Sequence, residues 1–414
     1  MTVDSADAPP LSPGQLFGVP GITQWTDQFE NTRNLSTTLN QTNQTNVNGD
    51  LKFKQTDVVF WWELDITITQ TYTAGTSAVT SSPYGPYNWV ASLALQIQNQ
   101  YSSLAATNTG GGVDAAIFQL IRPMRVGTDK RTNLDVNGAG LWSSNGGWAN
   151  ANFPQATLQT APAWASTAAS TTFTLEVPGS IFFDVYYDLD AAGNVVAPPH
   201  RAIVSPQYMA GTVRNVAPAI TYAAGSSSTL DAGPANIGAG TGTFAGTANL
   251  TIRRVGLYAG NPAALPVVYA WQYTRTTTPF SIAGRATANL VVPTQGQILS
   301  IFLRMFDPSA NGGLGAAIAV SALTSVQLQY GSGLLWADDT PKSAQRRFLK
   351  QHGFFPPVGC IIWDLALDEF GRTTNYKALN TLNTSGILTA LTFSSAQSAT
   401  AYVMMGVEAL TYVL

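Results

Sequence analysis

A ten-residue stretch occurs twice in the chain, and this repeat limits the possible folds more than any other feature of the sequence. Residues 179–188 and 359–368 match in residue class at every position except Tyr186 against Ala366, and their starting positions lie 180 residues apart. In both copies one set of alternate positions is apolar and the aspartates belong to the other set, which predicts a strand with one dry face. The repeat therefore predicts a chain of two similar halves.

The segments around the two copies follow the same order, which supports this interpretation. Each half opens with a long strand, continues with a partner strand, and ends with a pair of strands after its copy of the repeat. The chain has 414 residues, more than one core usually accommodates. The predicted strands outside the repeat are 58–72, 89–98, 115–121, 212–222 and 247–258 in the first half, and 267–277, 297–306, 318–320, 326–330, 387–393 and 401–413 in the second.

Prolines and glycines set the expected domain boundaries. Asn261, Pro262 and Pro266 mark a junction between the halves. Residues 1–21 are rich in proline and glycine, which favours an extended arm over a helix. We therefore predict an N-terminal arm at 1–21, a first domain at 22–262 and a second domain at 263–414.

The strand patterns predict an all-β protein. The clearest strand is 58–72, where Leu64, Ile66 and Ile68 alternate with charged or hydroxyl side chains. About eight strands in each half, with long loops at corresponding places, favour two tandem eight-stranded jelly rolls with short flanking helices.

One helix is clearly predicted after residue 339. Thr340 suits the N-cap, Pro341 suits the first helical position, and Gly353 follows the expected end. By contrast, the glycine-rich runs at 110–112, 238–242 and 311–315 are expected to be turns that precede no helix, and they lack the Lys-Ser/Thr of a phosphate-binding loop.

The predicted helix carries the only dense group of basic residues in the sequence. Lys342, Arg346 and Lys350 are spaced four residues apart, with Arg347 beside them. Two interpretations stay open for this basic stripe. It is either a solvated helix face or an ion-paired contact with a neighbouring subunit.

The composition argues against several classes of function. Only 10% of the residues are charged, against roughly 25% in an average soluble domain. The net charge of −3 provides no general field for nucleic acid or an anionic membrane. A polar but weakly charged surface suits a protein that buries its outside against copies of itself, although a secreted β protein with a Thr/Asn-rich surface is the alternative. The single cysteine, Cys360, cannot form an intrachain disulfide.

Residues for catalysis or metal binding are not apparent in the sequence. The two histidines, His200 and His352, have no carboxylate or cysteine at ligand spacing, so we expect no metal, no cofactor and no catalytic triad. Asp364 and Asp368, like the aspartates of the first copy, are expected to be solvated carboxylates on the wet face of the strand, although a glycosidase pair or a calcium site could use such residues. The protein is therefore not expected to be an enzyme.

Four segments resemble a known family. They are 339–349, 359–364, 401–408 and, more weakly, 84–89. In these segments the chain resembles the major capsid proteins of tectiviruses, which are tailless icosahedral phages with an internal membrane, and more broadly the double jelly-roll lineage that includes the adenovirus hexon. Residues 138–165, rich in Trp and Gly, match no part of that family.

The resemblance implies a structural role. A protein of this family would form homotrimers with a pseudo-hexagonal outline that assemble into an icosahedral shell. Its partners would be copies of itself, neighbouring capsomers, penton and minor capsid proteins, and the internal viral membrane, with no specific nucleic acid. It would be located in the virion capsid after assembly in the host cytoplasm.

The candidate contacts between subunits follow from both lines of reasoning. They comprise the basic stripe of Lys342, Arg346, Arg347 and Lys350, together with Leu16 and Phe17 of the arm. We expect the arm to be dispensable for the trimer but needed for the shell. The alternative function is a β-sandwich protein that binds carbohydrate or a receptor, which would not need to self-associate.

Overall fold

The structure is a computed structural model that describes part of the chain. The described residues are 22–26, 33–40, 43–48, 57–73, 80–81, 87–99, 103–108, 110–121, 169–178, 188–189, 195–196, 213–222, 235–236, 243–259, 271–293, 297–310, 315–330, 334–352, 355–365, 379–380 and 386–412. The predicted arm (1–21), the segment 138–165 and most of the first repeat copy (179–187) lie outside these residues.

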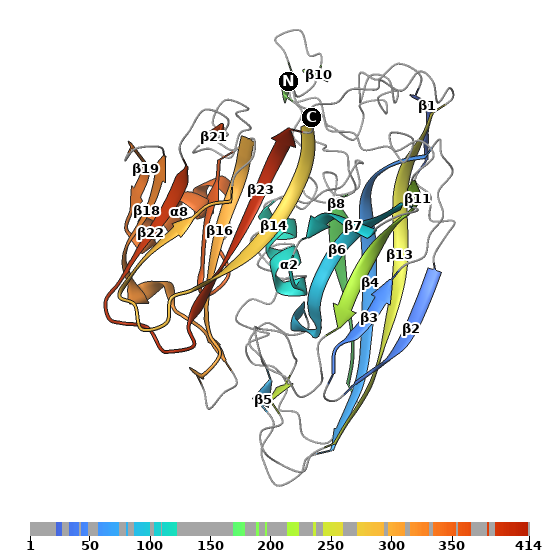
Figure 1. Ribbon diagram of the computed structural model, residues 1–414, viewed down its shortest axis with the longest axis horizontal. Coiled ribbons are helices and arrows are strands. Elements are labelled where there is room, and N and C mark those ends of the chain that lie inside the picture. The colour runs from blue at the N-terminus through green and yellow to red at the C-terminus, as the bar shows by residue number, and fades with distance from the viewer. Residues whose placement is uncertain are drawn as a thin grey trace.

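The first half is a sandwich of two antiparallel sheets, seen on the right of Figure 1. The strands of one sheet run in the order β2 (Arg33–Leu39), β13 (Thr243–Ala259), β4 (Asp57–Thr73) and β8 (Ala169–Pro178), and β1 (Ile22–Thr26) also pairs with β13. Those of the other run in the order β3 (Thr45–Asn48), β11 (Val213–Tyr222), β6 (Val90–Asn99) and β7 (Ser103–Asn108).

The second half repeats this arrangement on the left of Figure 1. One set of strands runs β14 (Trp271–Ser281), β23 (Tyr402–Tyr412), β16 (Gln297–Asp307) and β20 (Cys360–Asp364). The facing sheet runs β15 (Thr287–Val291), β22 (Ile387–Phe393), β18 (Leu323–Tyr330) and β19 (Leu334–Asp339). Among the described residues, six two-residue strands lie outside these sheets' long strands. They are β17 (Ala316–Ala317) and β21 (Leu379–Asn380) beside β16, and the pairs β5 (Thr80–Ser81) with β12 (Ala235–Asn236) and β9 (Asp188–Leu189) with β10 (Val195–Val196).

The order of strands in the two halves is the same. The eight strands named in the two sheets of each half, without β1, can be numbered along the chain. One sheet then has the order 1-8-3-6 and the other has the order 2-7-4-5. This is the order of a jelly roll, so the prediction of two tandem eight-stranded jelly rolls is confirmed.

Helices also repeat at equivalent places. In the first half, η1 (Tyr87–Trp89) precedes the fourth strand, and α2 (Gly112–Ile121) lies between the fifth and the sixth. In the second half, η5 (Val320–Ala322) and α8 (Pro341–His352) occupy the same places in the chain order.

The two halves share one sheet. β7 of the first half lies parallel to β14 of the second, with Asn108 opposite Thr276. This pairing joins the sheet that contains β7 to the sheet that contains β14, and together with β17 and β21 they form one ten-stranded sheet. The boundary predicted between residues 262 and 263 falls between the end of β13 and the start of β14, among residues outside the description, and stays a prediction.

Alternation along the strands explains the core of each half. On β4, Leu64, Ile66 and Ile68 are fully buried, as predicted, while the residues between them are partly exposed. β20 differs from the prediction of one dry face because all five of its residues are buried. Ile361 and Trp363 belong to the core of the second half, whereas Cys360 and Ile362 belong to a cluster shared with the first half.

Several sequence predictions were wrong. The segment 115–121 is part of helix α2, and residues 320–322 form the short helix η5 where a strand was predicted to end. The run 110–112 therefore does lead into a helix. β20 is the sixth strand of its half, and the equivalent strand of the first half is β8, which ends at Pro178 before the first repeat copy begins. The ten-residue match therefore predicted two similar halves correctly but did not align equivalent strands.

Candidate functional site: the junction between the halves and the outer helix

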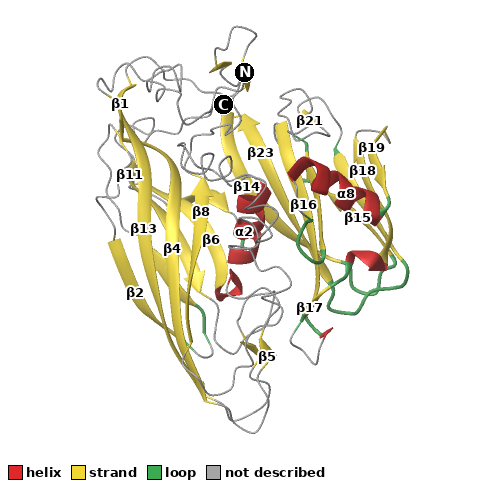
Figure 2. Ribbon diagram, turned by 180° about the vertical axis from the view of Figure 1, so that it is seen from behind, coloured by secondary structure: helices red, strands yellow, loops and turns green. Residues whose placement is uncertain are grey.

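Helix α2 lies between the two halves (Figures 1 and 2) and forms the centre of the junction that joins them. All ten of its residues are buried, including the polar side chains of Asp114 and Gln119, so the helix has no side that faces solvent. Gly110 has a φ of 74°, a conformation that favours glycine. Gly112 lies so close to the carbonyl of Tyr87 that no β-carbon would fit there. The glycines thus let α2 start tightly against its own half.

One buried ion pair links α2 to the second half. The Arg304 guanidinium on β16 donates hydrogen bonds to Asp114 Oδ1 through Nε at 2.9 Å and Nη2 at 2.8 Å. Both side chains are only 2% exposed. The backbone N–H of Gly111 donates to the other carboxylate oxygen of Asp114 at 3.4 Å, which places this side chain at the first turn of the helix.

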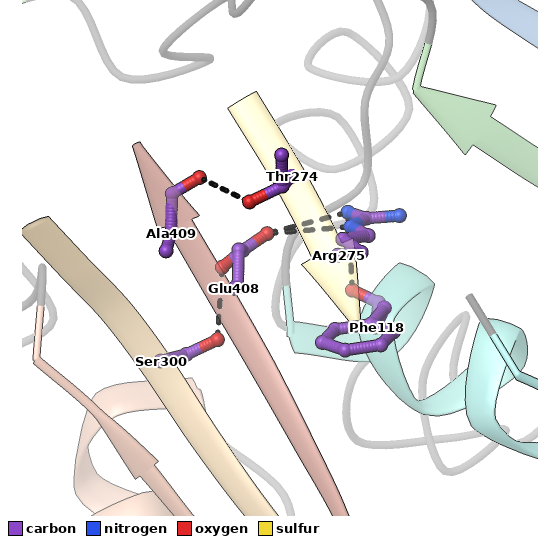
Figure 3. A network of polar contacts seen from close by, with 6 residues as sticks. All are labelled: Phe118, Thr274, Arg275, Ser300, Glu408 and Ala409. Atoms are coloured by element: carbon purple, nitrogen blue, oxygen red, sulfur yellow. Dashed lines mark hydrogen bonds and ion pairs between the residues drawn. The ribbon is translucent and has the colours of Figure 1, made fainter. Parts of the chain in front are cut away.

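A second buried network, shown in Figure 3, crosses the same junction. Arg275 on β14 donates from Nε and Nη2 to Glu408 Oε1 on β23, both at 3.4 Å, and from Nη2 to the carbonyl of Phe118 on α2 at 3.5 Å. Ser300 on β16 donates to Glu408 Oε2 at 2.9 Å. The side chains of Arg275 and Glu408 are fully buried.

Aromatic packing surrounds these charges. The ring of Phe118 meets that of Phe302 on β16 edge to face, with their centroids 4.9 Å apart. The Arg275 guanidinium carbon also lies 5.3 Å from the centre of the Phe118 ring. Gly406 on β23 leaves the space that the Phe302 ring fills. The junction is therefore a packed core as well as an ionic contact.

Burial dominates the electrostatics of the junction. It raises the pKa of Asp114, and Arg304 opposes this rise by favouring the carboxylate. Burial also raises the pKa of the Cys360 thiol, to about 12. Because an unpaired charge here would be costly, the ionic groups hold the two halves in one relative position.

Helix α8 begins as predicted and packs on the second half. The backbone N–H of Ser343 donates to Thr340 Oγ1 at 3.3 Å, which is an N-cap contact. Ala344 and Phe348 are buried, and the helix packs beside β20, the strand that follows it.

The four residues of the basic stripe on α8 lie in two different environments. Lys342, Arg346 and Lys350 are exposed. Arg347 instead is partly buried, and its Nη1 lies 2.9 Å from Asp339 Oδ2 within the same chain. A contact of these four residues with another subunit stays a prediction, and the arm residues Leu16 and Phe17 lie outside the described residues.

The far end of α8 is fixed by a pair that the sequence did not indicate. His352 Nε2 lies 3.2 Å from Asp364 Oδ2, and the His352 ring stacks on Phe348 with centroids 4.3 Å apart. Asp364 is 2% exposed, so its predicted place on a wet strand face was wrong. The reason is that α8 covers this end of β20. His200, Asp184 and Asp368 lie outside the described residues.

The described residues contain no cluster of metal ligands and no membrane-spanning helix. Within them, no three His, Cys, Asp or Glu side chains come together as ligands for a metal ion. None of the helices in the described part of the chain is long and apolar enough to cross a membrane.

Comparison with solved structures identifies the fold. The major capsid protein of Sulfolobus turreted icosahedral virus (STIV) superimposes with a TM-score of 0.52 at 14% identity, over 92% of this chain and 96% of that one. The chain has the double jelly-roll fold. The PBCV-1 virus capsid (TM-score 0.47, 11% identity, 94% and 95% covered) and the major capsid protein P2 of bacteriophage PM2 (0.40, 9%, 92% and 98%) were also found. No protein-family model and no curated protein sequence matches the chain.

The comparison confirms the fold that the family resemblance implied. The junction, by contrast, was missed by the sequence reasoning. Its signal was a single arginine within the apolar run of β16 and a single glutamate within that of β23, because an isolated charge in a buried strand requires a partner.

Proposed function

We propose that the protein is a major capsid protein that forms homotrimers with a pseudo-hexagonal outline and assembles into an icosahedral virion shell. The observation that carries this proposal is the junction. Two like jelly rolls are joined by a continuous sheet, by α2, by the buried Asp114–Arg304 ion pair and by the hydrogen bond from Arg275 to the Phe118 carbonyl, so each chain is a rigid pair of similar units. Three such pairs related by a three-fold axis supply the six similar units of a hexagonal capsomer.

The composition supports self-association. A chain with 10% charged residues can bury wide polar surfaces against its own copies with few charges to desolvate. The double jelly roll shared with the STIV major capsid protein supports the same function. In this proposal the role is structural and not enzymatic.

The wider assembly is part of the proposal. The trimer would contact neighbouring capsomers, penton and minor capsid proteins and an internal viral membrane, after assembly in the host cytoplasm. The arm, with Leu16 and Phe17, would contact an adjacent capsomer or the membrane. A chain that starts near Gly21 would then keep its trimer mass and circular dichroism but fail to form particles.

Light scattering coupled to size-exclusion chromatography tests the trimer. The purified chain should elute at three times its mass of 43.8 kDa, at concentrations down to the micromolar range. A monomer that binds carbohydrate or a receptor would instead support the alternative function. Loss of the trimer on removal of the arm would place the arm within the subunit interface and contradict its proposed role.

A further inference from the structure

Helices α2 and α8 occupy equivalent places but are covered differently. Each contacts the sixth strand of its own jelly roll (β8 or β20), the fourth strand (β6 or β18) and the short helix before that strand (η1 or η5). Figure 1 shows α2 between the halves and α8 on the second half, away from the first. The two helices are thus the same element in two copies of one unit.

The outward side of α2 is covered by the second half. Asp114 and Phe118, four residues apart, meet Arg304, Phe302 and Arg275 on the outer face of the β14–β23–β16 sheet. The outer face is the side that points away from the jelly roll's own core. The outward side of α8 carries Lys342, Arg346 and Lys350, which are exposed in the single chain.

The first half has a corresponding outer face, on the sheet β2–β13–β4. The strand register places Ser36, Asn249 and Thr67 in one row across this face, and Thr251 beside Asp65 in the next. Ser36 is exposed and the other four are partly exposed. The face is thus polar, open to solvent and carries the Asp65 carboxylate, whereas the equivalent face of the second half is buried under α2.

We propose that α8 of one copy docks on this outer face of the first half of the next copy, as α2 docks on the second half within a chain. This inference rests on the proposed trimer and specifies its interface. In this arrangement the cationic groups of α8 lie against the Asp65 carboxylate and the hydroxyl and amide groups around it. The arrangement reverses the junction, where the helix supplies the carboxylate and the sheet supplies the arginines.

The edge strands support the same arrangement. Within the chain, the fifth strand β7 lies beside the first strand β14 of the next unit. The equivalent fifth strand of the second half is β19 and the equivalent first strand of the first half is β2, and in the described part of the chain each is paired along one side only. Strands with an unpaired edge are surfaces that accept a partner. β19 of one copy would therefore lie along β2 of the next.

This contact is head to tail, so it must close into a ring or extend into a filament. In this arrangement the second half of one copy meets the first half of the next copy in the same relative position as the two halves of one chain meet. Six jelly rolls then surround one axis, and three chains close the ring. The intrachain junction is then the template for the contact between subunits.

A charge swap tests the interface in the full-length chain. The double change Arg346→Glu and Lys350→Glu should abolish the trimer peak in light scattering at micromolar concentration, and Asp65→Lys should weaken it. The combination of all three should restore trimer relative to Arg346→Glu with Lys350→Glu alone. The matched control is Arg285→Glu, an exposed arginine in the turn after β14, which should leave the trimer unchanged.

Zero-length carbodiimide cross-linking of the wild-type trimer gives a second measurement. It uses no variant, so its result cannot be affected by a failure of a variant to fold. With mixed light and heavy isotope-labelled chains, Lys342 or Lys350 should couple to the β4 segment that contains Asp65, between chains. If the wild type is a trimer, but the reversal has no effect and no such cross-link forms, this interface is wrong while the proposed function stands. If the wild type is a monomer, the proposed function fails and this inference fails with it.

Discussion

Replacing Arg304 with methionine should destabilise the protein strongly, because it leaves a buried carboxylate without its cation. Asp114 would lose two charge-assisted hydrogen bonds of 2.9 and 2.8 Å and keep the long contact from the Gly111 N–H. Methionine fills most of the volume of the arginine stem, so the cost is mainly electrostatic. Breaking a buried ion pair on one side costs about 3–5 kcal/mol of unfolding free energy.

The loss of unfolding free energy in Arg304→Met should depend on pH in a defined direction. Without Arg304, the pKa of Asp114 in the folded chain rises further above its unfolded value of about 3.9. A group with a raised folded pKa stabilises fully below its unfolded pKa, and this contribution is lost as the pH rises through the folded pKa. The variant should therefore be closest to the wild type in acid and fall furthest behind it at neutral pH.

Urea unfolding followed by tryptophan fluorescence measures this effect. Removing both partners, with Arg304→Met and Asp114→Ala, should cost less than Arg304→Met alone and abolish the added pH dependence, because no buried charge is left unpaired. Arg285→Met, at an exposed site, should change stability by no more than about 0.5 kcal/mol. The reasoning is refuted if Arg304→Met resembles this control, or if the double variant is as unstable as the single one.

Three further predictions concern packing, capping and thiol reactivity. Gly406→Ala should cost about 1–3 kcal/mol in urea unfolding, because the new β-carbon would collide with the Phe302 ring, and wild-type stability would contradict the packing described. Thr340→Ala should cost about 1 kcal/mol by the same measurement, through loss of the N-cap contact with Ser343, whereas Thr340→Ser should cost much less. The Cys360 thiol should not react with a thiol reagent at neutral pH until the chain is unfolded, since burial raises its pKa to about 12, and fast labelling of the native protein would argue against that burial.

Local patterns predicted the elements that have one buried face or a clear cap. β4 alternates as predicted, β22 spans the predicted strand 387–393, and α8 starts at Pro341 after the N-cap Thr340. These elements are visible in sequence because solvent on one side leaves a periodic signature.

Elements buried on all sides, or polar on most sides, were predicted poorly. Helix α2 has no polar face, so its apolar run at 115–121 could not be distinguished from a buried strand. The strands β2 and β3 are rich in Thr and Asn, and their polarity concealed them. Asp364 was assigned to solvent because the alternation within β20 cannot show that α8 covers the strand end.

The junction depends on contacts between residues far apart in sequence. Asp114 and Arg304 are separated by 190 positions, and Arg275 and Glu408 by 133. A single sequence shows that Asp114, Arg304 and Glu408 lie among apolar neighbours and so need partners, but the choice of partner follows from the way the two jelly rolls meet.

The central claim is that three copies of this rigid pair of jelly rolls build one capsomer. Single-particle electron microscopy of the purified chain tests it most directly. We predict particles with one three-fold axis and six similar β-sandwiches around it, in which α2 and α8 alternate at successive contacts. Isolated single chains, two-fold dimers, or rings of any other number of chains would contradict the claim.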